Sequence, residues 1–322
     1  MKKILLILLS VTLLIAFTGC GATTDDDNQI VTTTAENNTS NNGEDTTTAS
    51  GDETSSKEEG TSKEDVTSQV ETTSKEETTS KEETTTKAPG KYSDYDTTMM
   101  EYGVGTRILP DGRYEGPIYC ANLYKGYNVE FTKENEKVIY LTFDEGYENG
   151  YTPKILDTLK EKNVKAVFFL TMDFVKSEPQ LVQRMIDEGH VLGNHTVSHP
   201  SMPELSPEKQ IKELMDLHNH IKNNYGYDMY LYRPPMGKIS KQSVAIATDC
   251  GYTTVLWSFA YMDYDTSKQP TKEEALEIMT SRLHNGGLYL LHAVSSANTA
   301  ALGDFIDYAR AQGYTFVEYL KK

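Results

Sequence analysis

Apolar and polar positions divide the chain into two contrasting parts. In the C-terminal part, short apolar runs rich in β-branched and aromatic residues alternate with segments of helical periodicity. The first run, VIYLTF at 138–143, has the continuous apolar character of a strand that is buried on both faces. In the segment 153–163, Ile155, Leu156 and Leu159 fall on one helical face. The pattern therefore predicts buried strands that alternate with amphipathic helices.

The same alternation continues to the C-terminus. Further strands are predicted at 164–170, 190–194, 229–232, 253–258, 287–291 and 315–319. Further helices are predicted at 179–189, 206–226, 239–251, 271–283 and 298–313. Seven strands separated by helices predict a parallel α/β sheet, which is either doubly wound or closed into a (β/α) barrel. In both architectures, active-site residues gather at the C-terminal ends of the strands.

The first twenty residues predict an export signal. Lys2 and Lys3 precede an apolar run from Ile4 to Phe17, which is short for a membrane span. The sequence FTGC that follows resembles a lipobox, in which Cys20 would be lipidated and become the mature N-terminus. We expect a lipoprotein anchored on the extracellular face of the cell membrane, next to the wall. With an ordinary signal peptide the protein would instead be secreted.

Residues 21–92 predict a disordered linker. This segment consists mainly of Thr, Ser, Glu and Lys, and it repeats TTSKEE at 72–77 and 78–83. So few apolar residues cannot offset the conformational entropy lost on folding. A flexible chain of this length has a reach of about 45 Å. We expect a tether, followed by an N-terminal extension at 93–136 and the α/β domain at 137–322.

Charge and cysteine content narrow the possible partners. The formal net charge is -17, and residues 21–90 alone hold 17 acidic and 5 basic residues. Such a chain repels nucleic acid, which is therefore excluded as a partner. Besides Cys20, the chain has Cys120 and Cys250, which could form one disulfide but which we interpret as two free buried thiols. We expect the protein to be a monomer.

Acidic, basic and histidine side chains follow five of the predicted strands. Each residue alone has an ordinary explanation, such as a helix cap, a solvated histidine pair or a rigid turn. Because the ends of parallel strands meet at one edge of a sheet, the set predicts an active site. Its members are Asp144, Glu145, His195, His199, Arg233, Asp263 and His292.

The order of these motifs resembles a known enzyme family. TFDEG at 142–146, HTVSHP at 195–200, RPP at 233–235 and LLH at 290–292 resemble the motifs of NodB-homology polysaccharide deacetylases, carbohydrate esterase family 4. The resemblance covers about 137–320. It implies a distorted (β/α) barrel of seven or eight parallel strands and a hydrolase that removes N-acetyl groups from a glycan.

Longer stretches resemble the muramic-acid deacetylase subgroup of this family. They include FDEGYENGYTPKIL and YLYRPPMG, and they imply peptidoglycan glycan strands as the substrate, with N-acetylmuramic acid as the deacetylated sugar. Two positions depart from the family pattern. Glu145 stands where the family usually has a metal-binding Asp, and Tyr264 stands where it usually has Trp.

Amide hydrolysis needs an activated water, a polarised carbonyl and a protonated leaving amine. A divalent metal can provide the first two. We predict that His195 and His199, four residues apart on a helical turn, bind this metal together with Glu145. Zinc is our first choice, and cobalt, nickel and manganese also fit such ligands.

The remaining polar residues have predicted roles in proton transfer. Asp144 is the expected general base, held by a bidentate contact with Arg233. His292 is the expected acid that protonates the leaving nitrogen. Asp263 would raise the pKa of His292 so that this histidine is charged at the working pH.

Other residues are candidates for substrate binding. We expect Tyr147, Pro234, Pro235 and Tyr261 to line the groove, while Trp257 is better explained by core packing.

Three questions stay open at this level. Lys238 could bind a lactyl carboxylate, or it could simply be solvated. The substrate could be another polymer, such as peptidoglycan N-acetylglucosamine, chitin oligomers or a surface polysaccharide. The chain could also be a catalytically dead module that binds the wall.

Overall fold

The computed structural model describes residues 90–133 and 136–320. The predicted signal peptide, Cys20 and residues 21–89 of the linker lie outside the described residues. Lys91 and Tyr92, which the sequence assigned to the linker, already contact the domain. Lys91 forms an ion pair with Asp249 at 2.6 Å, and the Gln242 amide donates to the Tyr92 carbonyl at 3.0 Å. The predicted linker is therefore too long at its C-terminal end.

The sheet has eight strands, and all of its strand pairs are parallel. Its order is β10-β3-β4-β5-β6-β8-β2, with β9 also paired to β3. The strands are β2 (Val129–Glu130), β3 (Val138–Glu145), β4 (Val167–Leu170), β5 (Val191–Asn194), β6 (Leu231–Tyr232), β8 (Thr253–Val255), β9 (Gly287–His292) and β10 (Thr315–Phe316).

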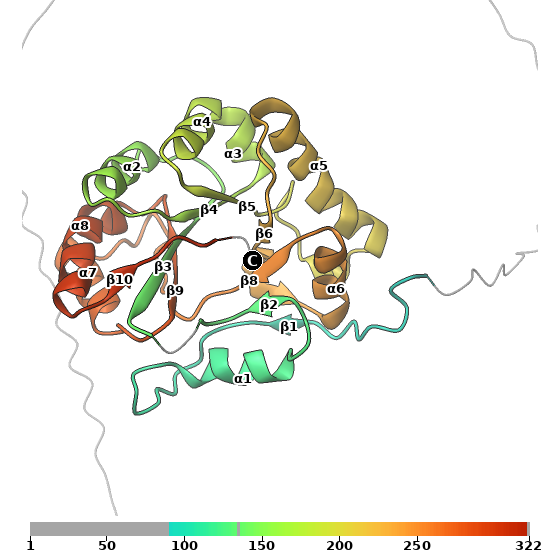
Figure 1. Cartoon of the computed structure of the whole chain (residues 1–322), viewed down its shortest axis with the longest axis horizontal. Coiled ribbons are helices and arrows are strands. Elements are labelled where there is room, and N and C mark those ends of the chain that lie inside the picture. Colours follow the sequence, from blue (N-terminus) through green and yellow to red (C-terminus); the bar gives the residue numbers. More distant parts are fainter. Residues whose placement is uncertain (1–89, 134–135, 321–322) are drawn as a thin grey trace, which may run out of the picture. The chain divides into compact units, whose positions relative to one another are not determined.

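The sheet curls back on itself, as Figure 1 shows. After β8, the chain returns to β9, where Leu290 N–H donates to the Phe259 carbonyl at 2.9 Å. The predicted α/β class and distorted barrel are therefore confirmed. The strands include all seven predicted ones, and β2 from the extension is the eighth.

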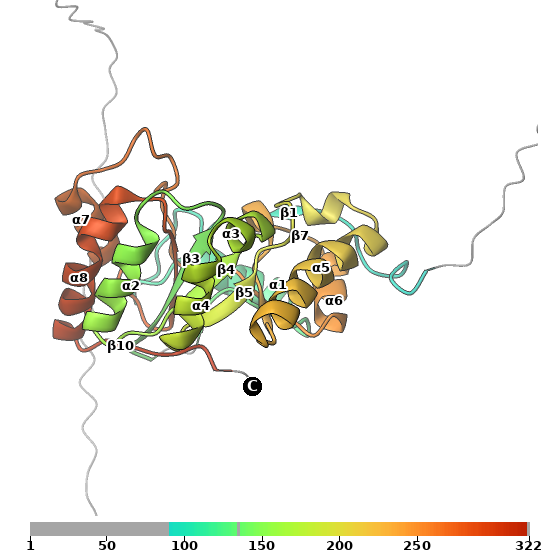
Figure 2. The ribbon, with the colours of Figure 1, turned by 90° about the horizontal axis from the view of Figure 1, so that it is seen from above.

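Helices cover the outside of the curled sheet (Figures 1 and 2). They are α2 (Thr152–Glu161), α3 (Met172–Ser177), α4 (Pro179–Asp187), α5 (Pro207–Tyr225), α6 (Lys241–Asp249), α7 (Lys272–Thr280) and α8 (Ser296–Ala311). All except α3 were predicted. Along α2, Ile155, Leu156 and Leu159 are buried as expected of an amphipathic helix. No helix in the described part is long and apolar enough to span a membrane.

The extension packs against the barrel through three short elements. β1 (Met100–Glu101) pairs antiparallel with β7 (Lys238–Ile239), α1 spans Glu115–Leu123, and β2 pairs with β8. A small apolar cluster, separate from the main core, joins the extension to the barrel. It contains Tyr102, Cys120, Tyr124, Phe131, Ile239, Val244 and Leu256. Cys120 and Cys250 are free thiols, as predicted.

Candidate active site

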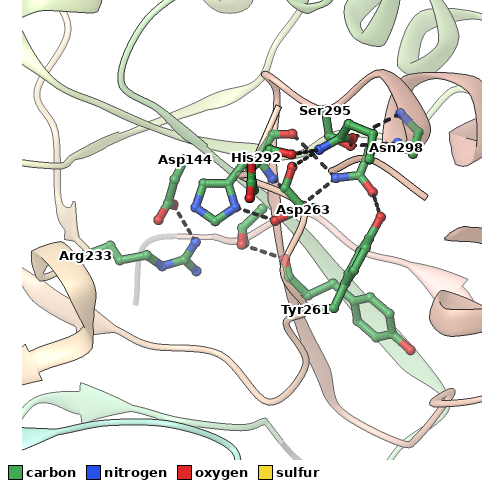
Figure 3. A network of polar contacts seen from close by, with 12 residues as sticks. Asp144, Arg233, Tyr261, Asp263, His292, Ser295 and Asn298 are labelled. Carbon is green, nitrogen blue, oxygen red and sulfur yellow. Dashed lines mark hydrogen bonds and ion pairs between the residues drawn. The ribbon is translucent and has the colours of Figure 1, made fainter. Parts of the chain in front are cut away.

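Strand register brings the two proposed proton-transfer residues together. Asp144 lies near the end of β3 and His292 at the end of β9, and the two residues are paired in the β3–β9 register. Figure 3 shows both side chains beside Arg233 and Asp263. The site thus lies at the carboxyl edge of the sheet, where the sequence predicted it.

Asp144 is held by a buried arginine. Arg233 is fully buried, and its Nη1 donates to Asp144 Oδ1 at 2.8 Å. Its Nε and Nη2 donate instead to the carbonyls of Val255 and Leu256, each at 3.1 Å. The predicted bidentate contact is therefore wrong, because the other guanidinium donors already have partners. Burial acts to raise the pKa of Asp144, but the charges of Arg233 and His195 outweigh it, so this pKa is lowered.

His292 is held by a buried carboxylate (Figure 3). Its Nδ1 lies 2.7 Å from Asp263 Oδ1, and its backbone N–H donates to Asp263 Oδ2 at 2.8 Å. The Asn298 amide also donates to Asp263, and the Tyr261 hydroxyl donates to Asn298. Burial acts to lower the pKa of His292, but the hydrogen bond and charge of Asp263 raise it above its ordinary value. Asn298 is a part of this network that sequence reasoning missed.

His195 and His199 lie side by side on a loop. The predicted helical turn is wrong, because Thr196 and His199 have positive φ angles of 72° and 57°. The two rings nevertheless lie 4.9 Å apart between centroids. His195 Nδ1 contacts the Arg233 carbonyl at 2.8 Å, which assigns the proton to Nδ1 and leaves the Nε2 lone pair free. Nε2 lies 3.5 Å from Asp144 Oδ2.

Both histidines are suited to metal binding in their neutral form. Burial lowers the pKa of His195 to about 4, and it also lowers the pKa of His199. Each imidazole is therefore uncharged near neutral pH and has a nitrogen lone pair available for a metal. These two side chains fit a divalent metal as two of its ligands.

Glu145 does not complete the predicted ligand set. Adjacent residues of a strand point to opposite faces, and Glu145 is fully buried on the side away from Asp144. Its Oε2 accepts from the Thr152 hydroxyl at 3.4 Å, and its Oε1 has no hydrogen-bond partner in the described structure. Burial and the nearby Glu148 raise its pKa well above the ordinary value. Within residues 90–133 and 136–320, no group of three or more His, Cys, Asp or Glu side chains could hold a metal ion.

Comparisons with known proteins identify the family. Residues 132–255 match the profile of polysaccharide deacetylases. The chain is 44% identical over 194 residues to the peptidoglycan-N-acetylmuramic acid deacetylase PdaA of Bacillus subtilis, covering 60% of this chain and 73% of PdaA. The chain belongs to the polysaccharide deacetylase family. It is therefore a hydrolase of carbohydrate esterase family 4.

A further relative and the solved structure of PdaA agree with this assignment. The deacetylase is 33% identical over 195 residues to a peptidoglycan-N-acetylglucosamine deacetylase of Bacillus cereus, covering 60% of this chain and 91% of that one. The solved structure of Bacillus subtilis PdaA, described as a family 4 carbohydrate esterase, superposes with a TM-score of 0.65. It is 38% identical and covers 68% of this chain and 94% of that chain. Metal dependence is general in the family.

A cavity of about 610 Å³ opens at the site of this deacetylase. Asp144, His195, His199 and His292 all line it, and so do three of the predicted substrate-binding residues, Tyr147, Pro234 and Tyr261. Pro235 is buried and is not among the lining residues. Sequence reasoning missed several other lining residues or assigned them elsewhere. They include Glu101, Met236, Trp257 and Tyr264.

Proposed function

We propose that this protein hydrolyses N-acetyl groups of peptidoglycan glycan strands, with Asp144 as general base and His292 as general acid. The observation that carries the proposal is that the pKa values of two residues on one cavity are displaced in opposite directions. The pKa of Asp144 is lowered and that of His292 is raised. A carboxylate ready to accept a proton therefore faces a histidine ready to donate one at the same pH.

The contacts assign an atom to each proton transfer. Asp144 Oδ1 accepts the hydrogen bond from Arg233, so Oδ2 is the oxygen that takes a proton from water. The water oxygen attacks the acetyl carbonyl carbon and forms the new C–O bond. When the C–N bond breaks, His292 gives the leaving nitrogen the proton of its Nε2, because its Nδ1 contacts Asp263. Acetate and a free sugar amine are the products.

We propose that His195 and His199 hold a divalent metal, with zinc as the first choice over cobalt, nickel and manganese. When bound, such a metal polarises the carbonyl and lowers the pKa of water. Glu145 is left out of this proposal because its carboxylate does not line the cavity.

N-acetylmuramic acid is the sugar we propose. Its support is the resemblance to a deacetylase of that sugar, although a relative that acts on N-acetylglucosamine is also similar. The cavity does not support the suggestion that Lys238 binds a lactyl carboxylate. Lys238 is not among the lining residues, and none of these is Lys or Arg. Muramic preference thus rests on resemblance alone.

We also propose the location and the domain organisation. A signal ending at Cys20 and a long polar linker suit a lipid-anchored monomer that reaches into the wall. Residues 93–136 belong with the catalytic domain, since Tyr102 and Phe131 pack against barrel residues. A catalytically dead wall-binding module is disfavoured, because Asp144 and His292 both line the cavity and each is hydrogen-bonded to a buried partner, Arg233 and Asp263 respectively.

The test is acetate release by the purified full chain from three glycans. They are intact peptidoglycan, peptidoglycan stripped of its peptides by an amidase, and chitin oligomers. Mass spectrometry of the digested products should show loss of one acetyl group and name the sugar that lost it. We expect the amidase-treated glycan to react fastest, through its muramic acid. Equal rates on all three would contradict the muramic preference, and no release from any would contradict the enzymatic function.

A further inference from the structure

The extension contributes Glu101 to the lining of the cavity. Through β1, residues 99–102 run between the loop that carries His199 and the segment that carries Trp257. On one side, the Ser201 hydroxyl lies 3.7 Å from Met99 Sδ. On the other side, Tyr102 N–H donates to the Gly237 carbonyl at 3.0 Å, and the Tyr102 hydroxyl donates to the Trp257 carbonyl. These contacts fix β1 at both ends.

The close approach of β1 depends on a glycine. Gly237 has a φ angle of 66°, which favours glycine. A Cβ atom at this position would lie 2.9 Å from the Trp257 ring and 3.0 Å from the Tyr102 carbonyl oxygen. Strand β1 therefore approaches the barrel so closely that only glycine fits at position 237.

Strand alternation turns one carboxylate of β1, that of Glu101, toward the cavity. Met100 and Tyr102 pack in the small apolar cluster between the extension and the barrel. Glu101 lies between them and points to the opposite face, where it lines the cavity with Asp144, His195 and His292. Its carboxylate has no hydrogen bond or ion pair with any other described residue. Its cross-strand partner Lys238 forms no ion pair with it in that part of the chain and does not line the cavity.

The Glu101 carboxylate is therefore available to interact with a substrate in the cavity. We propose that Glu101 is a specificity-determining residue, which disfavours an anionic group on the β1 side of the cavity and accepts a hydroxyl or amino hydrogen of the glycan there. This inference rests on the proposed glycan substrate. For a muramic acid residue without its peptide, it means that the lactyl carboxylate is turned away from β1. A neutral N-acetylglucosamine unit has no such restriction.

The test compares Glu101→Gln with the wild type on two glycans of equal length. One is a peptide-free glycan that carries lactyl carboxylates, and the other is a neutral chitin oligomer. We expect Glu101→Gln to raise kcat/KM on the anionic glycan relative to the neutral one by about two- to fivefold, the range of a partly exposed charge. The gain should shrink as salt is added, because salt screens exposed charges.

A matched control lies in the same extension. Glu115 is also a partly exposed carboxylate, but it pairs with Arg107 at 2.8 Å and does not line the active-site cavity. The variant Glu115→Gln should leave the ratio between the two glycans unchanged. An unchanged ratio in Glu101→Gln, or the same change in Glu115→Gln, would overturn the assignment.

Binding separates this inference from the proposed function. Dissociation constants for the same two glycans are measured in the Asp144→Asn background, so they do not depend on turnover. If the wild type released no acetate, the proposed function would fail, yet Glu101→Gln should still strengthen binding of the anionic glycan over the neutral one. If acetate is released but Glu101→Gln changes neither binding nor kcat/KM selectively, the proposed function stands and the role of Glu101 fails.

Discussion

Two walls of the cavity are built in different ways. The wall made by the strand ends holds Asp144 and His292 through partners that are fully buried, namely Arg233 and Asp263. The second wall, made by side chains of β1 and of loops, is largely exposed. Its side chains include Glu101, Tyr147, Met236 and Tyr264. The residues of the first wall are held in fixed positions, which suits proton transfer. The residues of the second wall are exposed and can differ between enzymes that act on different sugars.

The largest expected effect comes from breaking the buried wall at Asp144. The variant Asp144→Asn cannot accept a proton from water, so kcat should fall by about 10²- to 10⁴-fold. It also leaves the buried Arg233 without its carboxylate, which lowers the free energy of unfolding by roughly 3–5 kcal/mol. Assays must therefore run well below the unfolding temperature, with circular dichroism to confirm the fold.

The neighbouring carboxylate provides the control. Glu145 is buried and does not line the cavity, and burial together with the nearby Glu148 raises its pKa well above the ordinary value. Glu145→Gln replaces this acid by a neutral group of similar shape and should leave kcat close to that of the wild type. A wild-type kcat in Asp144→Asn would show that Asp144 is not the general base. A large loss of kcat in Glu145→Gln would show that Glu145 takes part in the reaction.

The next effect concerns His195 and His199, which also line the cavity. His195→Ala and His199→Ala should each lose bound metal and about 10- to 100-fold or more in activity, since even weaker perturbations of metal sites cost this much. Elemental analysis of the purified variants measures the metal. His220→Ala on α5, away from the cavity, should keep it. Wild-type metal content in either cavity variant would exclude that histidine as a ligand.

The strand-end wall was largely predictable from the sequence. The apolar run at 138–143 marks β3, and parallel strands then place Asp144 and His292 at one edge of the sheet. The sequence suggested that His292 comes from the opposite side of the barrel mouth, which is wrong, because β9 pairs directly with β3. The pattern did not reveal β1 or β7, because each pairs one apolar residue with a charged one and neither lies in an apolar run. It also missed α3, which follows β4 directly and whose buried Met172, Phe174 and Val175 extend the apolar run of that strand.

Local geometry explains the errors within the site. Motif spacing placed Glu145 beside the metal, yet the alternation of β3 sends it to the other face. Spacing also suggested a helical turn for His195 and His199, where the backbone is left-handed at Thr196 and His199. A positive φ is uncommon for residues other than glycine, and most of all for a β-branched residue such as Thr196, so the motif spacing did not predict it. Asn298 could have been found, because it opens the helix capped by Ser295, three residues after His292.

A smaller effect is expected from Asp263, the hydrogen-bond partner of the proposed acid His292. Asp263→Asn removes the charge that raises the pKa of His292, while burial continues to lower that pKa. Because His292 must be protonated to donate, activity is lost as pH rises through its pKa. The alkaline limb of the kcat/KM profile should therefore move from above the ordinary histidine value of 6.5 to below it. At a pH above both the old and the new pKa, kcat/KM falls about tenfold whenever this pKa is lowered by about one.

The full pH profile distinguishes this role from simple destabilisation. A merely structural loss would lower kcat/KM at all pH values and leave the alkaline limb in place, which would contradict the assignment.

The pair of Asp263 and His292 in the wild type also makes the stability of the fold depend on pH. Since the folded pKa of His292 is raised, its stabilising contribution is complete below the unfolded pKa and is lost as pH rises through the folded pKa. In urea titrations, Asp263→Asn should show a smaller decrease in the free energy of unfolding over this pH range than the wild type.

The smallest expected effect lies on the exposed wall. Tyr264 is 54% exposed, lines the cavity, and its ring lies 5.5 Å from the His292 ring. Such a ring can stack on the sugar without taking part in proton transfer. Tyr264→Ala should raise KM by about threefold, with kcat nearly unchanged, since an aromatic contact contributes about 0.5–1.5 kcal/mol. Tyr264→Trp keeps the flat face and should restore KM. Met262 is a matched control, because it is 67% exposed and does not line the cavity. An equal KM increase in Met262→Ala, or a fall in kcat with constant KM in Tyr264→Ala, would show that Tyr264 does not act by binding the sugar.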